Sequence, residues 1–324
     1  MQVNSLPTKI LITGGAGFIG SSLADSLLKD NNRVCVVDNY LTGMKENNQT
    51  HTNLTVYHIS ISDAHLVNEI FNEFQPEIVV HAAASYKNPD AWDEDIDNNI
   101  IGTVNVIKAC KLFGVQKLVY YQTSLCYGIS QVNEPINIGH PYFSGTYEGG
   151  SSYAISKTTA ELYLELSGIN FISLRLANVY GPRNLSGPLP SFFHRLYNNL
   201  PCVVVDTKRD FIYIDDVVDC TCKAIRSSVK KGYYHISTGT DHTIKELFER
   251  TLEILGKNKT EIVVDYVEKG PDDVNTILLD PSQTMLDFDW KPMTSFSEGV
   301  RKAISWYQEN GISQTYTHLK NIPA

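Results

Sequence analysis

The chain has 324 residues, 42% hydrophobic and 19% charged, which is enough for one large domain or two modest domains with hydrophobic cores. Its net charge of −9 argues against a protein that binds nucleic acid or anionic membranes. No apolar run is long enough to span a bilayer, residues 1–8 lack a signal pattern, and the six cysteines show neither a paired framework nor zinc spacing. We therefore expect reduced thiols, no metal site and a cytoplasmic protein.

The first element is a short apolar run, residues 9–13, which we expect to be a strand. It leads into a glycine-rich turn with Gly14, Gly17 and Gly20, and a helical pattern follows. In this context glycines permit a tight turn and let the backbone approach a pyrophosphate, which then lies at the helix N-terminus. The stretch therefore predicts a dinucleotide site.

The next two expected strands cover residues 34–37 and 54–59, and each precedes an acidic residue. Asp38 ends the first of them, where a carboxylate can bind both ribose hydroxyls of NAD and repel the extra phosphate of NADP. Its alternative role is that of a turn acid before Asn39 and Tyr40. Asp63 follows the other strand as a helix cap, an adenine contact, or both.

The fourth expected strand, residues 78–80, runs into His81 and three alanines. The small residues let this loop lie close to a cofactor, and His81 is interpreted as a structural histidine rather than a catalyst. Lys87 follows the same strand. It is either a solvated loop lysine or a contact for a negatively charged sugar such as a uronate.

The remaining pattern alternates helices and strands. We expect a long helix over 93–113, a fifth strand over 117–121 that leads to Thr123, and a sixth strand over 171–176. Such alternation predicts an α/β fold of the Rossmann type, a doubly wound parallel sheet with helices on both faces. Ligands bind beyond the carboxyl ends of such strands, so the glycine turn, Asp38, His81 and Thr123 share one edge.

Tyr153 and Lys157 lie four residues apart at the start of another expected helix, and so on one helical face. A tyrosine has an unperturbed pKa of about 10, which makes it a poor base at neutral pH. A nearby ammonium favours the phenolate and lowers that pKa. A pair of this kind also arises by chance on helix surfaces, so the assignment depends on the rest of the chain.

After Leu176 the sequence becomes richer in loops and prolines. We expect residues 1–177 to form the NAD-binding domain, with a returning segment at 211–236. Residues 178–324 are expected to form a smaller C-terminal α/β domain that binds a nucleotide sugar.

Several motifs together carry a family resemblance. They are Thr13–Gly20, Asp38, His81–Ala83, Asn99–Thr103, Thr123–Gly128, Tyr153–Lys157, Arg175–Gly181 and Arg209–Phe211. With them the sequence resembles the extended short-chain dehydrogenase/reductase family, in its nucleotide-sugar epimerase and dehydratase branch. The finer pattern is most similar to WbmG-like O-antigen sugar epimerases. The resemblance implies a seven-stranded NAD-binding sheet with a smaller sugar-nucleotide domain.

The resemblance also implies a reaction and roles for residues. Tightly held NAD oxidises a sugar hydroxyl, usually at C4, and the keto sugar turns and takes the hydride back on its other face. Tyr153 is the implied base, Lys157 lowers its pKa and holds the nicotinamide ribose, and Thr123 bonds to the reacting oxygen. The implied cofactor contacts are Gly14, Gly17, Phe18, Ile19, Asp38, Asn39, Asp63, Ala82, Ala83, Asn99, Tyr153 and Lys157. The expected substrate contacts, for a UDP- or GDP-sugar, are Lys87, Ser124, Asn178 and Arg209.

Departures from the family pattern reduce the number of reactions that the chain could catalyse. The sugar 4,6-dehydratases carry an Asp-Glu pair directly after the catalytic threonine, whereas this chain has Ser124 and Leu125. Neither can protonate a leaving group, which argues against a dehydratase. Cys126 is expected to point into packing. The family places a diphosphate-binding arginine near residues 268–273. This chain has no arginine there and offers only Lys269, displaced by one position.

Three functions remain open at this point. The first is an NAD-dependent nucleotide-sugar epimerase, and the second is a dehydrogenase or reductase that releases or uses the keto sugar. The third is a non-catalytic NAD-binding scaffold, against which the intact Thr123, Tyr153 and Lys157 argue. The family resemblance also implies a homodimer formed through the helices at 93–113 and 152–166.

Overall fold

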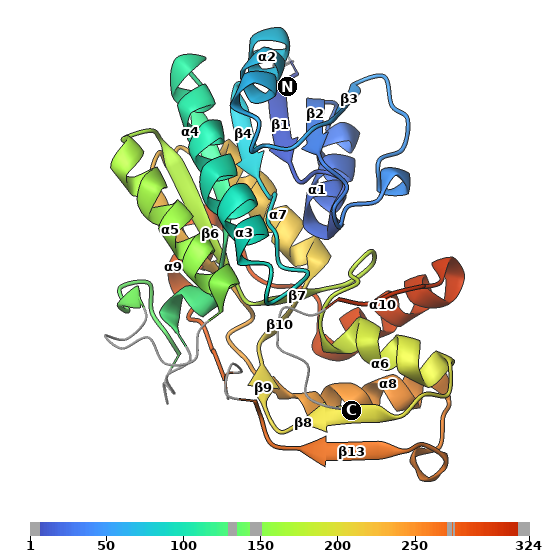
Figure 1. The fold of residues 1–324 in the computed structure, drawn as a ribbon. Coiled ribbons are helices and arrows are strands. Elements are labelled where there is room, and N and C mark those ends of the chain that lie inside the picture. Colours follow the sequence, from blue (N-terminus) through green and yellow to red (C-terminus); the bar gives the residue numbers. More distant parts are fainter. Residues whose placement is uncertain (1–6, 129–134, 143–150, 271–273, 275, 317–324) are drawn as a thin grey trace, which may run out of the picture.

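The computed structural model describes residues 7–128, 135–142, 151–270, 274 and 276–316. A parallel seven-stranded sheet forms the upper part of the molecule in Figure 1, in the order β11-β6-β5-β4-β1-β2-β3. Its strands are β1 Lys9–Thr13, β2 Arg33–Asp38, β3 Leu54–His58, β4 Ile78–His81, β5 Lys117–Thr123, β6 Phe171–Leu176 and β11 Gly232–Ile236. The order reverses direction between β1 and β4, and a crevice beyond the carboxyl ends of the strands is expected at such a switch point.

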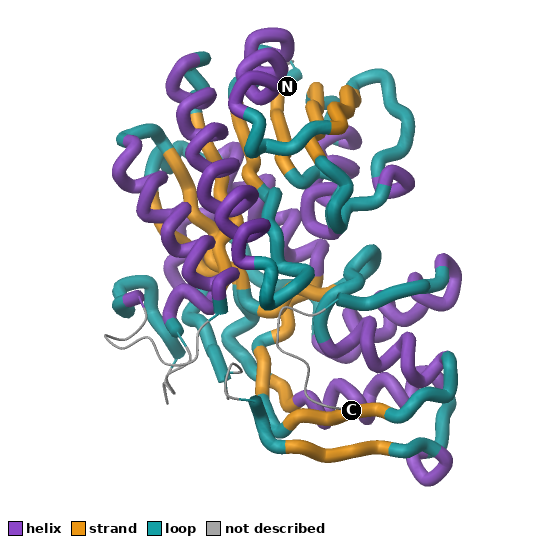
Figure 2. The backbone as a smooth tube through the Cα atoms, in the orientation of Figure 1, coloured by secondary structure: helices purple, strands orange, loops and turns teal. Residues whose placement is uncertain are grey.

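Helices cover both faces of this sheet (Figure 2). Side chains alternate along β1, so that Ile10 and Ile12 join the core on one face while Leu11 joins the core on the other. The first face is covered by α1 Phe18–Lys29 and α7 Ile214–Arg226, and the second by α2 Ala64–Phe74, α4 Thr103–Leu112 and α5 Ser152–Ser167. Burial on both faces explains the near-continuous apolar sequence of the strands.

The helix expected over 93–113 is interrupted. It consists of α3 Trp92–Asp95, a π-helical stretch η2 at Ile96–Gly102, and α4. Gly102 lies against the loop after β3, where an added Cβ would come within 2.6 Å of the Ile61 side chain. Single π-helical turns of this kind often mark functional sites, and their position has no simple sequence signal.

A smaller α/β part lies below the sheet in Figure 1. Its helices are α6 Pro188–Tyr197, α8 Ile244–Leu255 and α10 Phe296–Asn310, and its parallel strand pair is β8 Cys202–Val205 with β13 Val264–Val267. Helix α6 begins at Pro188, because proline fits the first helical position, where no backbone N–H is needed.

Short strand pairs connect the two parts. β7 Asn178–Tyr180 pairs with β10 Phe211–Tyr213, and β9 Lys208–Arg209 pairs with β12 His242–Thr243. The segment at 211–236 contains β10, α7 and β11, and β11 adds the edge strand beside β6. Helix α9, Ser282–Phe288, packs near β11. The remaining short 3-10 helices are η1 Lys45–Asn47, η3 Ser124–Tyr127 and η5 Lys259–Glu261.

All six cysteines are buried and free. Cys126, which directly precedes the buried Tyr127, belongs to the hydrophobic core as expected. Over the described ranges, no helix is both long and apolar enough to cross a membrane.

Candidate active site

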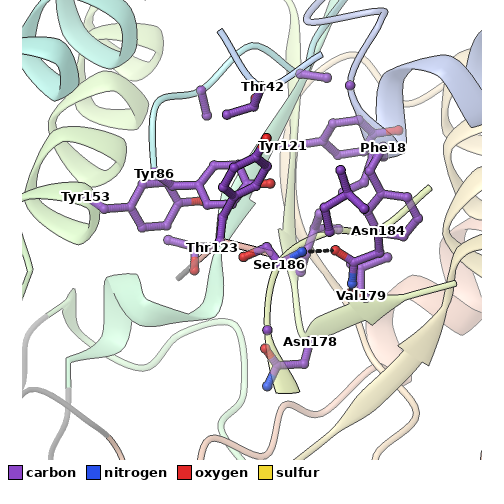
Figure 3. A pocket seen from close by; sticks show the side chains of 18 of the residues that line it. Phe18, Thr42, Tyr86, Tyr121, Thr123, Tyr153, Asn178, Val179, Asn184 and Ser186 are labelled. Atoms are coloured by element: carbon purple, nitrogen blue, oxygen red, sulfur yellow. Dashed lines mark hydrogen bonds between the residues drawn. The ribbon is translucent and has the colours of Figure 1, made fainter. Parts of the chain in front are cut away.

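A cavity of about 690 Å³ opens at the carboxyl edge of the sheet, and Figure 3 shows part of its lining. Its wall comes from the turn after β1, the ends of β2, β4 and β5, the start of α5, and the loops that enter the smaller part. The cavity therefore joins the region expected to bind a cofactor to the region expected to bind a nucleotide sugar.

The glycine turn after β1 brings the backbone close to the loop after β4. Gly14 has φ +67°, and a Cβ at this position would lie 2.6 Å from the Ala83 nitrogen. A Cβ on Gly20 would collide with the Gly14 carbonyl oxygen, so α1 can approach the turn only with glycine there.

The N-terminus of α1 faces the cavity. Its N-cap is Gly17, which supplies no side-chain cap, and Gly17, Phe18 and Ile19 all line the cavity. The first N–H groups of a helix carry partial positive charge and suit an anion such as a pyrophosphate. Ala82 and Ala83 line the cavity opposite this turn.

Asp38 lines the cavity at the end of β2 and is 7% exposed. Its two oxygens accept hydrogen bonds from the backbone nitrogens of Ala16, at 2.9 Å, and Tyr40, at 2.7 Å. Burial raises the pKa of this carboxyl group, and the backbone donors oppose that shift. A carboxylate has about four lone-pair sites, so Asp38 serves the turn and retains acceptors for a ribose diol.

Of two further predicted cofactor contacts, Asn39 and Asp63, only the first lines the cavity. Asn39 lines the cavity, and its side-chain oxygen accepts from the Leu41 nitrogen at 3.0 Å. Asp63 is the N-cap of α2, where it accepts from the nitrogens of His65 and Leu66 at 3.0 Å each. Asp63 is not among the residues that line the cavity, so its helix-capping role is the one that the geometry displays.

His81 is fully buried at the end of β4 and bonds through both ring nitrogens. Thr103 donates to the Asn99 carbonyl at 2.6 Å, so its oxygen accepts from His81 Nε2 at 2.8 Å. Nδ1 then accepts from the Thr13 hydroxyl at 2.6 Å. Burial lowers the pKa of His81 to about 3, which keeps the ring neutral. This geometry agrees with a structural histidine.

Asn99, in the π-helical stretch, is 1% exposed and joins two walls of the site. It accepts from the Ser85 nitrogen at 2.8 Å and donates to the Ser85 carbonyl at 3.1 Å and to the Ser156 hydroxyl at 2.9 Å. Asn99 does not itself line the cavity. It instead holds the loop after β4 against α5.

The three predicted catalytic residues all line the cavity, and Figure 3 shows Tyr153 reaching into it from α5, with Thr123 nearby. Ser151 caps α5 by accepting from the Ala154 nitrogen at 3.2 Å. Thr123 ends β5, and its hydroxyl oxygen accepts from the Leu125 nitrogen at 3.2 Å. Within the described part of the chain, this hydroxyl donates no hydrogen bond, so its proton is available to a ligand.

The electrostatics of this pair differ from the expectation. Burial, with smaller contributions from Tyr86 and Asp95, raises the pKa of Tyr153 rather than lowering it. Burial also lowers the pKa of Lys157 to about 7, against the opposing charge of Glu161. The Lys157 ammonium lies 4.0 Å from the centre of the Tyr120 ring, an arrangement that favours its charged form. In the polypeptide alone, desolvation outweighs the effect of the lysine on the tyrosine.

A buried ion pair behind these residues was not predicted. Glu161, one helical turn after Lys157, bonds to Arg175 of β6 through Oε2 at 3.0 Å and Oε1 at 3.2 Å. The side chains are 0% and 3% exposed. Ser173 also donates to Glu161, and the Arg175 guanidinium donates to the Tyr127 hydroxyl at 2.6 Å. The pair fixes α5, and so Tyr153 and Lys157, against the sheet.

The predicted substrate contacts divide into two groups. Ser124, Asn178 and Arg209 line the cavity, and one Arg209 nitrogen donates to the Val274 carbonyl at 2.8 Å. Lys87 is exposed and does not line the cavity; its ammonium lies over the Tyr316 ring, 5.1 Å from the centre. Lys269 does not line the cavity either, and residues 271–273 of the expected arginine region lie outside the described residues.

Arg183 is a cavity residue that sequence reasoning missed. It follows β7 with φ +69°, and its guanidinium forms an ion pair with Asp25 at 2.8 Å and donates to the Ser21 hydroxyl at 3.1 Å. Both partners lie on α1, so Arg183 connects the smaller part to the helix that begins at the glycine turn. Its only sequence signal is its place directly after the Arg175–Gly181 motif and Pro182.

No group of three or more His, Cys, Asp and Glu side chains is placed to hold a metal ion within the described ranges.

Comparisons with known proteins identify the family of the chain. Residues 10–237 match the model of the NAD dependent epimerase/dehydratase family. The crystal structure of Bordetella bronchiseptica WbmH in complex with NAD+ is 43% identical, with a TM-score of 0.88 over 94% of this chain and 100% of that chain.

Two further structures are similar over nearly their whole length. B. bronchiseptica WbmG, in complex with NAD and UDP, is 38% identical with a TM-score of 0.88, over 99% of this chain and 100% of that one. The UDP-glucose 4-epimerase of Thermotoga maritima, with UDP-glucose, is 30% identical with a TM-score of 0.84, over 93% and 98%. The family and the fold expected from the motifs are thereby confirmed: the chain belongs to the NAD dependent epimerase/dehydratase family.

Proposed function

We propose that the protein epimerises a nucleotide-activated sugar, a hexose or a uronic acid, at C4 by transient oxidation with bound NAD. The observation that carries the proposal is the gathering of Thr123, Tyr153 and Lys157 on one wall of the cavity. The glycine turn and Asp38 line the same cavity and suit a dinucleotide.

The residues present fit NAD. The uncapped N-terminus of α1 suits the pyrophosphate, Asp38 suits the adenosine ribose, and Ala82 and Ala83 leave room beside the turn. NAD, when bound, accepts a hydride from the sugar carbon and returns it. The NAD in the WbmH and WbmG structures supports this assignment.

The side chains then have defined tasks. Tyr153 takes the proton of the sugar hydroxyl during oxidation and returns it during reduction. Thr123 donates its hydroxyl hydrogen to the reacting oxygen, and Lys157 supplies positive charge beside the phenolate. Burial raises the pKa of Tyr153 in the polypeptide alone, and the positive charge of an oxidised nicotinamide bound beside the phenol would favour the phenolate.

The carboxylates of the cavity favour epimerisation over dehydration. Of the described residues that line it, only Asp38 and Asp210 carry a carboxyl group, and Ser124 and Leu125 follow Thr123. Asp38 is bonded at the glycine turn, and Asp210 accepts from the Gly239 nitrogen at 2.9 Å and from the nitrogen and hydroxyl of Thr238. Both carboxylates are thus engaged with backbone and hydroxyl donors, and the residues directly after Thr123 carry no carboxyl group.

The nucleotide end of the cavity contains suitable donors. Asn178 and Arg209 line it, and their side-chain N–H groups suit a diphosphate. The UDP in the WbmG structure supports a uridine nucleotide over a guanosine nucleotide.

We also infer a homodimer formed through α3, η2, α4 and α5. Eight large hydrophobic side chains are exposed on these helices: Trp92, Ile96, Ile101, Leu112, Ile155, Leu162, Tyr163 and Leu166. A group of exposed apolar side chains on neighbouring helices is typical of an interaction surface.

One experiment tests the proposed reaction. The purified protein is denatured, the released cofactor is identified with its redox state, and the native protein is offered UDP-hexoses and UDP-uronates without added NAD. Stoichiometric NAD and a new C4 epimer are expected. Product that forms only with added NAD, while a keto sugar accumulates, would instead identify a dehydrogenase.

A further inference from the structure

The segment that follows α10 returns to the cavity and completes its wall. Thr315 and Tyr316 line the cavity, together with Tyr86 and Ser186. Tyr316 forms a parallel bridge with Ser186, in which the Tyr316 nitrogen donates to the Leu185 carbonyl at 2.8 Å and the Gly187 nitrogen donates to the Tyr316 carbonyl at 3.4 Å. Two distant stretches of the chain therefore meet at this wall.

This wall lies next to the predicted reaction centre. The ring centres of Tyr86 and Tyr153 are 6.1 Å apart, and Figure 3 shows the two side chains close to Thr123 and Ser186. Burial raises the pKa of Tyr86 to about 12, and the Ser186 side chain opposes that rise. Tyr86 therefore remains a neutral phenol at physiological pH and can donate a hydrogen bond.

Hydrogen bonds and a cation–π contact hold the wall in place. The Ser186 nitrogen donates to the side-chain oxygen of Asn184 at 2.9 Å, and Asn184 is 5% exposed. The buried Tyr307 of α10 donates to the Asn184 carbonyl at 2.9 Å. Tyr316, the other residue of the bridge, is contacted by Lys87, whose ammonium lies 5.1 Å from the centre of the Tyr316 ring. These contacts fix the wall before a ligand binds, as a selective site requires.

We propose that Tyr316, with Tyr86 and Ser186, contacts the sugar ring of the substrate and limits the size of the substituents that the enzyme accepts. This inference rests on the proposed function. Aromatic rings offer flat apolar faces to the C–H groups of a sugar, and the hydroxyls can bond to its polar substituents. The wall comes from other segments of the chain than the α1 turn and Arg209, so we expect it to act on the sugar more than on the cofactor or the nucleotide.

The test compares the wild type with Tyr316→Ala, both in the NAD-loaded form. Calorimetry measures the dissociation constants of UDP, UDP-glucose and UDP-N-acetylglucosamine. Removal of the ring should shift the affinity ratio of the two sugars by about tenfold toward the bulkier one, while UDP binding stays within about twofold. Tyr266→Ala, an exposed tyrosine on β13 that does not line the cavity, is the matched control and should leave all three constants unchanged.

The outcomes separate this inference from the proposed reaction. An unchanged sugar ratio in Tyr316→Ala, with UDP binding intact, would overturn the role of the wall. Loss of UDP binding would also overturn it, because the residue would then serve the nucleotide. If the affinity ratio shifts as expected in Tyr316→Ala but the wild type epimerises no sugar, the role of the wall would be upheld and the proposed function would be rejected.

Discussion

At the scale of single residues, the cavity gathers the side chains of the proposed base, its neighbouring lysine and a threonine hydroxyl on regular secondary structure. Thr123 ends a buried strand, and Tyr153 and Lys157 occupy the first two turns of α5. Their spacing follows from the helix, whereas their protonation states follow from burial. The pKa of Tyr153 is raised and that of Lys157 is lowered to about 7, both chiefly by desolvation.

Tyr153→Phe should lower kcat by about 10²–10⁴-fold, because the proton of the sugar hydroxyl then has no acceptor. Bound NAD should remain, since the ring still fills its place. The measurement is steady-state turnover together with the cofactor content of the purified variant. Tyr197→Phe, at a tyrosine 65% exposed on α6, is the control and should retain activity. A normal kcat in the Tyr153→Phe variant would remove Tyr153 from the mechanism.

The pH profile of kcat/KM should rise with pH as Tyr153 loses its proton. Below about pH 7, where Lys157 keeps its proton, Lys157→Met removes a positive charge beside that phenol, so the pKa of Tyr153 increases and the rising limb moves to higher pH. We expect lower activity at pH 7 and partial recovery at pH 9. A limb at the wild-type position, with activity uniformly reduced, would mean that Lys157 positions the cofactor without tuning the base.

At the scale of secondary-structure elements, the buried pair of Arg175 and Glu161 holds α5 to β6. Removal of one partner from a buried pair leaves an uncompensated charge. A similar pair, Lys231 and Glu165 at 2.6 Å, joins α5 to the start of β11, but its side chains are 43% and 46% exposed. The same helix thus offers a buried and an exposed example.

Arg175→Met should lower the free energy of unfolding by about 3–5 kcal/mol, because Glu161 would lose its buried partner. Lys231→Met should cost about 1 kcal/mol or less, since water screens the exposed pair. Urea unfolding of both variants, followed by fluorescence, gives the comparison. Equal small losses would show that Glu161 finds other partners or takes up a proton at little cost.

The sequence predicted the elements that depend on local patterns. Apolar runs located the strands, and the glycines before α1 located the turn, because both signals lie within a few neighbouring residues. The π-helical stretch around Asn99, the pair of Glu161 with Arg175, and the bridge of Ser186 with Tyr316 were not predicted. Each of these depends on contacts between distant segments, which one sequence does not encode in a readable pattern. The pKa of Tyr153 was missed for the same reason, because burial is a tertiary property.

At the scale of the whole molecule, the sheet carries the cofactor side of the cavity and the smaller part closes the other side (Figure 1). The opposite surface of the sheet layer, formed by α4 and α5, is apolar and exposed. Leu112 and Leu166 are 68% and 79% exposed there.

The double variant Leu162→Glu with Leu166→Glu should be a monomer at micromolar concentration, where we expect the wild type to be a dimer. The two residues lie on one face of α5, and charges there would have to be buried in the dimer. Sedimentation velocity measures the mass. Leu286→Glu, at a leucine 77% exposed on α9, is the control and should remain dimeric. A monomeric wild type would contradict the inferred interface.

The most direct test of transient oxidation follows the hydrogen at the inverted carbon. A UDP-sugar that the purified protein converts is labelled with deuterium at C4 and supplied without added NAD. The proposed reaction predicts an epimer that keeps its deuterium at C4, because the hydride leaves and returns within one active site. Deuterium lost to solvent, or found on released NADH beside a keto sugar, would contradict epimerisation by transient oxidation.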